Sequence, residues 1–171
     1  MQFVLECDRM DGLVFIDKGY LTELDSDMLY AMDILLDVPG TSELIFDFPG
    51  EAWDTVRLRE TKPIREFCDK GKMIIWLLDG VEKECKIEKR NEIAEASQWL
   101  HIPTGQLLAV TASELIQCLS YPELEMEKVF ELEVEAGWYA ISNEGIDKIL
   151  YCKKEQPNII TSNIQEIYEN S

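Results

Sequence analysis

The feature that most constrains the fold of this sequence is a pair of apolar runs joined by Asp79-Gly80. Residues 73–78 read Met-Ile-Ile-Trp-Leu-Leu, and residues 81–88 alternate apolar with charged side chains. Asp-Gly between two such runs is the strongest short-range signal for a β-hairpin, because these residues adopt the positive φ angles of a tight turn. We therefore predict a hairpin here, and the alternation predicts that its second strand is half exposed at a sheet edge.

The rest of the chain contains further short strands and helices. Strands are predicted at 3–7 and 13–16 (paired as a hairpin), 44–48, 99–102, 107–110, 129–134, 138–141 and 149–152, and helices at 26–37, 61–69, 113–119 and 161–169. Asp25 or Ser26 is suited to cap the first of these helices. Together these elements predict an α+β fold of mostly antiparallel β-sheet with three or four short helices.

The length of 171 residues and the 46% hydrophobic content fit a single domain spanning 1–171. A faint repeat lays residues 13–21 over 107–115 and residues 47–53 over 133–138. This repeat leaves open an internal duplication, with halves at about 1–90 and 91–155 and a C-terminal helical tail at 156–171.

The charge of the chain is large and unevenly distributed. Thirty-four Asp and Glu against sixteen Lys and Arg give a formal net charge of −18. Residues 19–56 contain nine acidic side chains and no Lys or Arg, whereas residues 57–90 contain ten basic and seven acidic ones. We interpret the mixed stretch as a solvent-exposed face of salt bridges, and we expect another face to be strongly negative.

This charge and the absence of targeting signals exclude several classes of protein. Nucleic acid and anionic membranes repel a strongly acidic surface, so neither is expected as a partner. The sequence has no apolar run near the roughly 20 residues of a membrane span, and its N-terminus lacks the basic and apolar regions of a signal peptide. Five scattered cysteines without a C-x-x-C motif favour reduced thiols and a cytoplasmic protein.

No motif for catalysis, cofactor binding or metal binding is present, and we predict no such residues. His101 is the only histidine and lies between Leu100 and Ile102, which favours a satisfied or outward-facing residue of a strand. The sequence has no glycine-rich phosphate loop and no clustered metal ligands. Two alternatives to a binding protein stay open: a small cytoplasmic enzyme that uses carboxylate or cysteine chemistry, and a phage or secretion-system assembly protein.

Two acidic segments that also carry tryptophan are the candidate partner-binding residues. They comprise Asp47, Glu51, Trp53 and Asp54 in the first half, and Glu131, Glu133, Glu135 and Trp138 in the second. Like charges at alternate positions repel one another across a strand face, so a cationic partner would relieve the repulsion. Tryptophan beside carboxylates suits an interface with a partner rich in Arg or Lys. These residues predict an acidic protein that binds a basic protein, with an oligomeric state that the sequence does not fix.

Two segments of the second half carry a family resemblance. Residues 102–110 (Ile-Pro-Thr-Gly-Gln-Leu-Leu-Ala-Val) and 135–141 (Glu-Ala-Gly-Trp-Tyr-Ala-Ile) resemble the small, β-rich immunity proteins of bacterial polymorphic-toxin systems, mainly over residues 98–142. The resemblance implies a cytoplasmic protein that neutralises a cognate toxin, often a basic nuclease, by covering its active site with acidic residues. It implies no catalytic residues.

Overall fold

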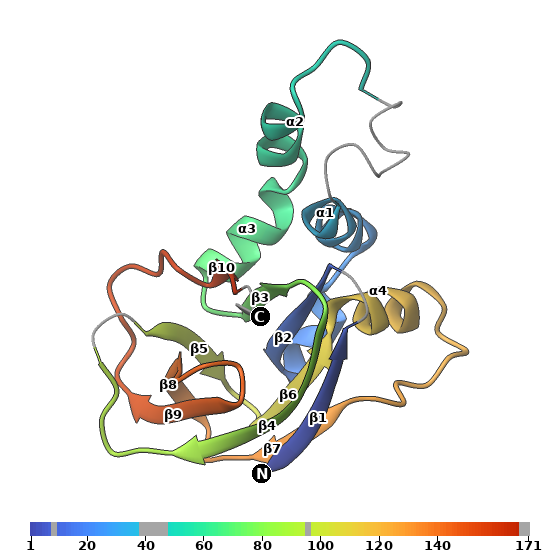
Figure 1. Ribbon diagram of the computed structural model, residues 1–171. Coiled ribbons are helices and arrows are strands. Elements are labelled where there is room, and N and C mark those ends of the chain that lie inside the picture. The colour runs from blue at the N-terminus through green and yellow to red at the C-terminus, as the bar shows by residue number, and fades with distance from the viewer. Residues whose placement is uncertain (8–9, 38–47, 95–96, 168–171) are drawn as a thin grey trace.

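The computed structural model describes residues 1–7, 10–37, 48–94 and 97–167. In chain order these residues form β1 (Gln2–Cys7), β2 (Asp11–Asp17), the 3-10 helix η1 (Lys18–Glu23), α1 (Ser26–Leu36), α2 (Trp53–Glu60), α3 (Lys62–Asp69), β3 (Met73–Leu78), β4 (Val81–Lys89), β5 (Gln98–Ile102), β6 (Gln106–Thr111), α4 (Ala112–Ser120), β7 (Phe130–Glu133), β8 (Gly137–Asn143), β9 (Lys148–Lys154) and β10 (Ile164–Glu166) (Figure 1). The predicted α+β class is confirmed.

The strands form two five-stranded sheets. Sheet A has the order β1-β4-β9-β8-β5, and sheet B has the order β10-β3-β2-β6-β7. Neighbouring strands are antiparallel except for β4 with β9 and β10 with β3, which are parallel. The predicted predominance of antiparallel pairing is therefore confirmed.

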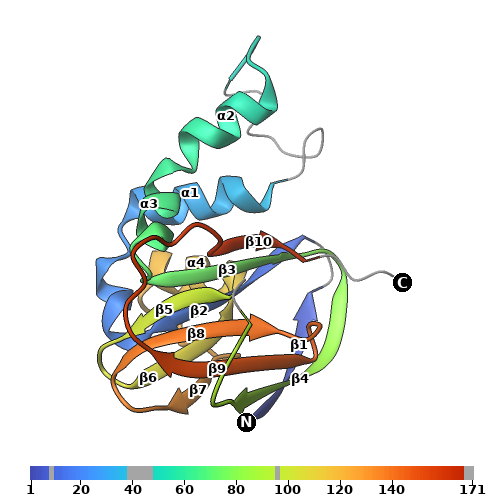
Figure 2. The ribbon, with the colours of Figure 1, turned by 90° about the vertical axis from the view of Figure 1, so that its left-hand side faces the viewer.

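Sheet B is the middle of three layers. One of its faces packs against sheet A through Phe15 and Trp76, and the other packs against α1, α3 and α4 through Val14 and Ile75. Figure 2 shows α1–α3 above the strands. A strand covered on both faces must be apolar at every position, which explains why all six residues of β3 are buried.

The hairpin predicted around Asp79-Gly80 is wrong, although both strands exist. β3 lies in sheet B and β4 in sheet A, so the turn carries the chain from one sheet to the other instead of joining paired strands. Gly80 has the positive φ (62°) that the sequence led us to expect. β4 alternates buried and exposed residues as predicted, but it lies between β1 and β9 and is not an edge.

The same exchange between sheets occurs at four other places, one of them the segment between β9 and β10. β1 and β2 do not pair with each other, so the predicted hairpin of residues 3–7 and 13–16 is also wrong. The turn 103–105 and the residues between β7 and β8 likewise join strands of different sheets. Strands that continue around corners are typical of two sheets packed across each other.

Three predicted helices are confirmed and one is wrong. α1, α3 and α4 lie where the patterns placed them, with Asp25 accepting from the backbone N–H of Met28 at the start of α1. The helix predicted at 161–169 is replaced by β10, which pairs with β3. α2 was not predicted: among its residues only Val56 is buried, so it has no apolar periodicity. The strand predicted at 44–48 lies, except for Phe48, outside the described residues.

The two segments of the internal repeat have partly different structures. Residues 13–21 and 107–115 each run from a strand into a helix, and β2 and β6 are antiparallel neighbours. Trp53, however, begins α2, whereas Trp138 lies within β8. The duplication stays a prediction. None of the described helices is long and apolar enough to cross a membrane.

Candidate partner-binding surface

The structure divides the sequence-predicted residues into two separate groups. The first group lies at the start of α2, at the far end of the helical arm that α2 and α3 form above the sheets: Glu51, Trp53 and Asp54 (Figure 1). Glu131, Glu133, Glu135 and Trp138 lie on or beside β7 and β8, at the opposite end of the molecule (Figures 1 and 2). Asp47 lies outside the described residues. The two groups therefore form no continuous surface.

The acidic stripe of β7 is exposed as predicted and partly neutralised. Phe130 and Leu132 turn toward the core, while Glu131 and Glu133 face solvent. Glu131 lies 3.8 Å from the ammonium of Lys18, and Glu135 lies 2.7 Å from that of Lys153. The hydrogen bond from Lys153 lowers the pKa of Glu135. Local cations thus relieve part of the repulsion that we had assigned to a partner.

Trp138 packs within the protein and leaves only part of its ring for contact. Its indole stacks on His101 with ring centres 4.8 Å apart, and it covers Gly71 so closely that an added Cβ there would overlap the ring. His101 in turn is hydrogen-bonded through Nδ1 to the Tyr20 hydroxyl at 2.6 Å. Burial and the nearby Lys72 lower the pKa of His101. The interpretation of His101 as a satisfied residue of a strand is confirmed.

The residues at the start of α2 are tied to their own helix. Glu51 receives a hydrogen bond of 2.7 Å from Arg59, so its charge is compensated within the arm. The indole nitrogen of Trp53 is buried and has no hydrogen-bond partner in the part of the chain that the structure describes. Asp54 is exposed in the first turn of α2, where the helix dipole favours a negative charge.

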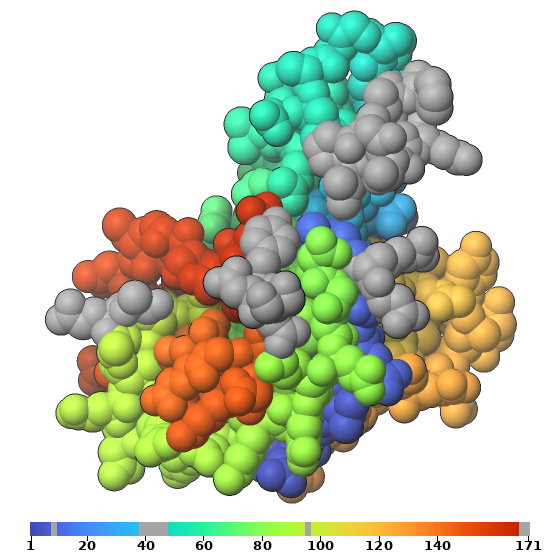
Figure 3. Space-filling view, viewed as in Figure 1, coloured from blue at the N-terminus to red at the C-terminus, as the bar shows by residue number. Residues whose placement is uncertain are grey.

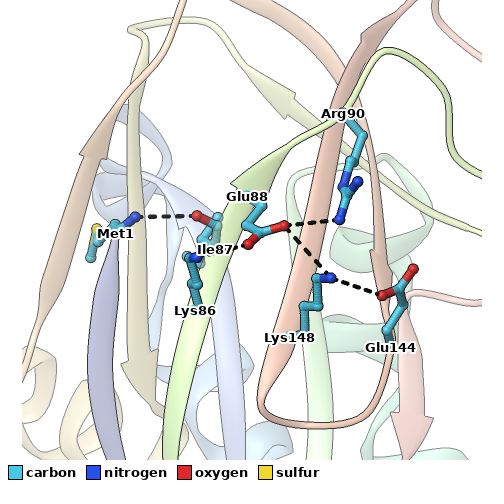
Figure 4. A network of polar contacts seen from close by, with 7 residues as sticks. All are labelled: Met1, Lys86, Ile87, Glu88, Arg90, Glu144 and Lys148. Atoms are coloured by element: carbon cyan, nitrogen blue, oxygen red, sulfur yellow. Dashed lines mark hydrogen bonds and ion pairs between the residues drawn. The ribbon is translucent and has the colours of Figure 1, made fainter.

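The outer face of sheet A carries mixed charges in networks (Figure 4). Glu88 accepts from Lys86 and Arg90, each at 2.9 Å, and lies 3.8 Å from Lys148, which also pairs with Glu144 at 3.3 Å. These cations lower the pKa of Glu88. Ion pairs of this kind confirm the interpretation of residues 57–90 as salt-bridged solvent faces.

The strongly negative side lies elsewhere, on a surface that we call the α1–α4 face: α1, α4 and the segment 121–127. α1 and α4 are in contact, and residues 112–127 (gold) protrude from the side of the molecule in Figure 3. Residues 19–56 contain no Lys or Arg, and neither do residues 91–127. The α1–α4 face is thus built from two base-free stretches of the chain. Its carboxylates are Asp25, Asp27, Asp33, Glu114, Glu123, Glu125 and Glu127.

A groove of about 390 Å³ runs along one side of α4. Its walls carry the carboxylates of Glu6, Asp11, Glu114, Glu125 and Glu127. Among the described residues of its lining Lys128 alone is basic, and it lies 3.5 Å from Glu6. Glu114 is held in place by the backbone N–H groups of residues 127 and 128, which donate to it at 2.8 and 2.9 Å. The groove offers carboxylates in excess of the cations around them.

A second groove, of about 440 Å³, separates α4 from α1. Its lining is mainly apolar and includes Leu29, Ile116 and Leu119, with Tyr30 and Asp33 on the α1 side. The Tyr30 side chain is 42% exposed. Desolvation and the neighbouring Asp37 raise the pKa of Asp33.

Exposed apolar side chains gather on the same face. Tyr121 is 56% exposed and Leu124 is 43% exposed, and both follow α4 directly. Together with Tyr30 they account for half of the large apolar side chains that are exposed in the described residues. Aromatic residues are enriched in protein interfaces, whose rims are polar.

Sequence reasoning missed this surface although a signal was present. The base-free stretch 91–127 is nearly as long as the stretch 19–56, but its acidic residues are concentrated in 114–127 and were not singled out. That α1 and α4 lie side by side could not be read from either segment alone, because the contact is set by how both helices cover sheet B.

The cysteines do not form a reactive site. All five are buried and unpaired by disulfides. Burial raises the pKa of the Cys68 and Cys118 thiols and raises that of Cys85 to about 11, so these thiols stay protonated at neutral pH. In the described residues, no three His, Cys, Asp or Glu side chains are grouped to hold a metal ion.

Comparison with known proteins gives little further guidance. No family model matches the chain, and no curated protein matches it. A solved structure described as "Crocagin biosynthetic gene J" matches at 13% identity with a TM-score of 0.42, over 90% of this chain and 96% of that one.

Proposed function

We propose that this protein binds a basic protein through the α1–α4 face and inhibits it, as an immunity protein inhibits a bacterial toxin domain. One observation carries the proposal: two stretches of the chain without Lys or Arg lie side by side and expose carboxylates together with aromatic and apolar side chains. Such a surface supplies both the charge and the apolar contact area of a protein interface.

The physical advantage of this surface is greatest for a partner with a positive cleft. Enzymes that act on nucleic acids have such clefts, and carboxylates that fill them give complementarity as well as electrostatic steering. Association of complementary proteins reaches about 10⁸–10⁹ M⁻¹s⁻¹ at low salt. The same charge disfavours direct binding of nucleic acid or of an anionic membrane. Five buried cysteines, none of them in a disulfide, fit a cytoplasmic setting, and this mode of binding needs no cofactor.

The test uses the polypeptide encoded by the gene immediately upstream as the partner. We expect it to be toxic when expressed alone, to be neutralised by co-expression of this protein, and to bind with an association rate that falls steeply between about 50 and 300 mM salt. A partner that neither binds nor is neutralised, or an affinity indifferent to ionic strength, contradicts the proposal.

Matched charge variants locate the interface. The triple variant Glu123→Gln, Glu125→Gln, Glu127→Gln removes three exposed carboxylates from the α1–α4 face. The control Glu82→Gln, Glu84→Gln, Glu92→Gln removes three exposed carboxylates from β4 and the residues after it. Both variants change the net charge equally, so only position differs. We expect the first to slow association on the order of tenfold and the second to slow it by less than about threefold. Equal effects would refute the assigned surface.

A further inference from the structure

The side chains that line the groove between α1 and α4 are suited to bind a third helix. Leu29, Ile116 and Leu119 form its apolar lining, and Tyr30 and Asp33 stand on the α1 side. Ile116 and Leu119 are only partly buried, although both lie on the apolar side of α4 and contact the helical core. Apolar side chains of this kind gain further burial when a partner covers them.

The dimensions of the groove suit a short helix. The lining extends from Ser26 to Asp33 on α1 and from Ile116 to Ser120 on α4, which at about 1.5 Å per residue gives walls of roughly 12 and 8 Å. A partner helix of about ten residues covers this length. Apolar residues at helical spacing on one side of such a helix would meet the lining, as in other complexes in which an amphipathic helix occupies a groove.

The charge around the groove selects the occupant. Asp33 lines the groove, Asp25 and Asp27 lie at the start of the same helix, and neither α1 nor α4 contains a Lys or Arg. An acidic or neutral helix would leave these carboxylates without compensation, whereas a basic helix would pair with them from the rim. Charge complementarity of this kind also works against partners of the wrong sign.

We propose that the groove between α1 and α4 binds a basic amphipathic helix of the inhibited partner. This inference rests on the proposed function and assigns the segment of the partner that is recognised. The groove accounts for the apolar part of the interface, and the carboxylates of the α1–α4 face account for its attraction of a cationic partner.

The experiment uses three synthetic 14-residue peptides as probes and the full-length protein. The first peptide has Leu at positions 3, 6, 7 and 10, Lys at five other positions and Ala elsewhere. The second has the same composition with Leu at alternate positions, so that a helix would have no apolar side. The third carries Glu in place of Lys. Fluorescence anisotropy gives the dissociation constants. The measurement is made at about 150 mM salt, because at this ionic strength attraction between surface charges alone is strongly screened.

We expect the first peptide to bind at least about tenfold more tightly than the second, and the third not to bind. Equal binding of the first two peptides overturns the proposal, because it would show attraction by charge alone. Absence of binding by the first peptide overturns it as well.

Variants at the groove complete the test. Leu119→Gln makes the lining polar, and Ser120→Arg places a cation at the exposed last residue of α4, where the helix dipole favours it and folding is not threatened. Each is expected to weaken binding of the first peptide at least about fivefold. Leu58→Gln, on the exposed side of α2 (66% exposed), is the matched control and should leave binding unchanged. Unchanged affinity in Ser120→Arg overturns the assignment of the groove.

The outcomes separate the two proposals. If the groove variants retain wild-type affinity for the upstream-encoded polypeptide while the Glu123, Glu125, Glu127 variant loses affinity, the groove inference is refuted and the proposed function stands. If the wild-type protein does not bind that polypeptide at all, the proposed function is refuted, and the peptide measurements still decide whether the groove accepts a basic helix.

Discussion

The side-chain amide of Asn163 is the single polar group on which the C-terminal segment depends most. Asn163 is 2% exposed. Its oxygen accepts from the backbone N–H of Trp99 at 3.1 Å, and its nitrogen donates to the carbonyl of Trp99 at 2.8 Å. The amide thus pairs with both outward backbone groups of Trp99 on the edge strand β5, as a neighbouring strand would. The same nitrogen lies within hydrogen-bond distance of the carbonyls of Cys68 and Met73.

The cost of removing this amide follows from the groups left behind. Asn163→Ala leaves the N–H and C=O of Trp99 without their side-chain partner, and a buried polar group without a partner costs about 1–3 kcal/mol. Counting these two groups alone, we expect a loss of about 3 kcal/mol in the free energy of unfolding. For a chain of this length about 2–4 °C of melting temperature is lost per kcal/mol, which gives a decrease of about 6–12 °C.

The assay is urea unfolding and thermal melting at pH 7 of three proteins: wild type, Asn163→Ala and Asn158→Ala. Asn158 is an exposed asparagine of the same segment, so its variant should change the free energy of unfolding by less than about 0.5 kcal/mol. If Asn163→Ala is no more destabilised than Asn158→Ala, the side-chain amide does not hold the C-terminal segment and the argument fails.

Three further predictions concern packing, protonation and thiols. Gly71→Ala should destabilise the protein by about 2–4 kcal/mol, because φ is 74° and the added Cβ overlaps the Trp138 ring. Gly80→Ala has a φ of 62° but open space around it, so it should cost only about 1 kcal/mol. Urea unfolding measures both free energies. Burial lowers the pKa of His101 below its ordinary 6.5, so on acidification the unfolded chain binds a proton at His101 before the folded protein does. The free energy of unfolding therefore falls as pH drops through 6.5. His101→Phe should lose less stability than wild type between about pH 7 and 5, and an equal loss contradicts the assignment. Because every thiol is buried, a thiol reagent at about pH 7.5 should modify less than one cysteine per folded chain within minutes and all five in denaturant. Rapid modification of the folded protein would contradict that burial.

The sequence predicted most of the secondary structure but not which strands pair. Alternation and apolar runs located the strands, because burial on one or both faces leaves a local pattern. The pair 73–78 and 81–88 shows the limit of such patterns: Asp79-Gly80 specifies a tight turn, but a turn does not determine whether its two strands stay in one sheet. The unbroken apolar character of β3 was the clue, since a strand buried on both faces belongs to a middle layer, whereas the alternating β4 belongs to an outer one.

The C-terminal segment was mistaken for a helix because its local pattern is weak. Residues 161–169 contain two isoleucines and a tyrosine at spacings compatible with one helical side. The structure instead pairs β10 with β3, and the backbone N–H of Ile75 donates to the carbonyl of Asn163 at 2.8 Å. The edge of β3 and the backbone groups that bind the Asn163 amide determine the outcome, and both belong to residues between 64 and 95 positions away.

The carboxylates of the α1–α4 face divide into those that stabilise local structure and those that do not. Asp25 caps α1 and Asp27 lies in its first turn, while Glu114 lies in the first turn of α4 and accepts two backbone N–H groups, so each has a structural reason to be acidic. Asp33 lies in the second half of α1, where the helix dipole opposes a negative charge, and desolvation together with the neighbouring Asp37 raises its pKa. The three glutamates of 121–127 make no ion pair among the described residues. Because these four carboxylates do not stabilise the local structure, the case for a cationic partner depends on them. A partner that left them uncovered would have to be bound by some other surface.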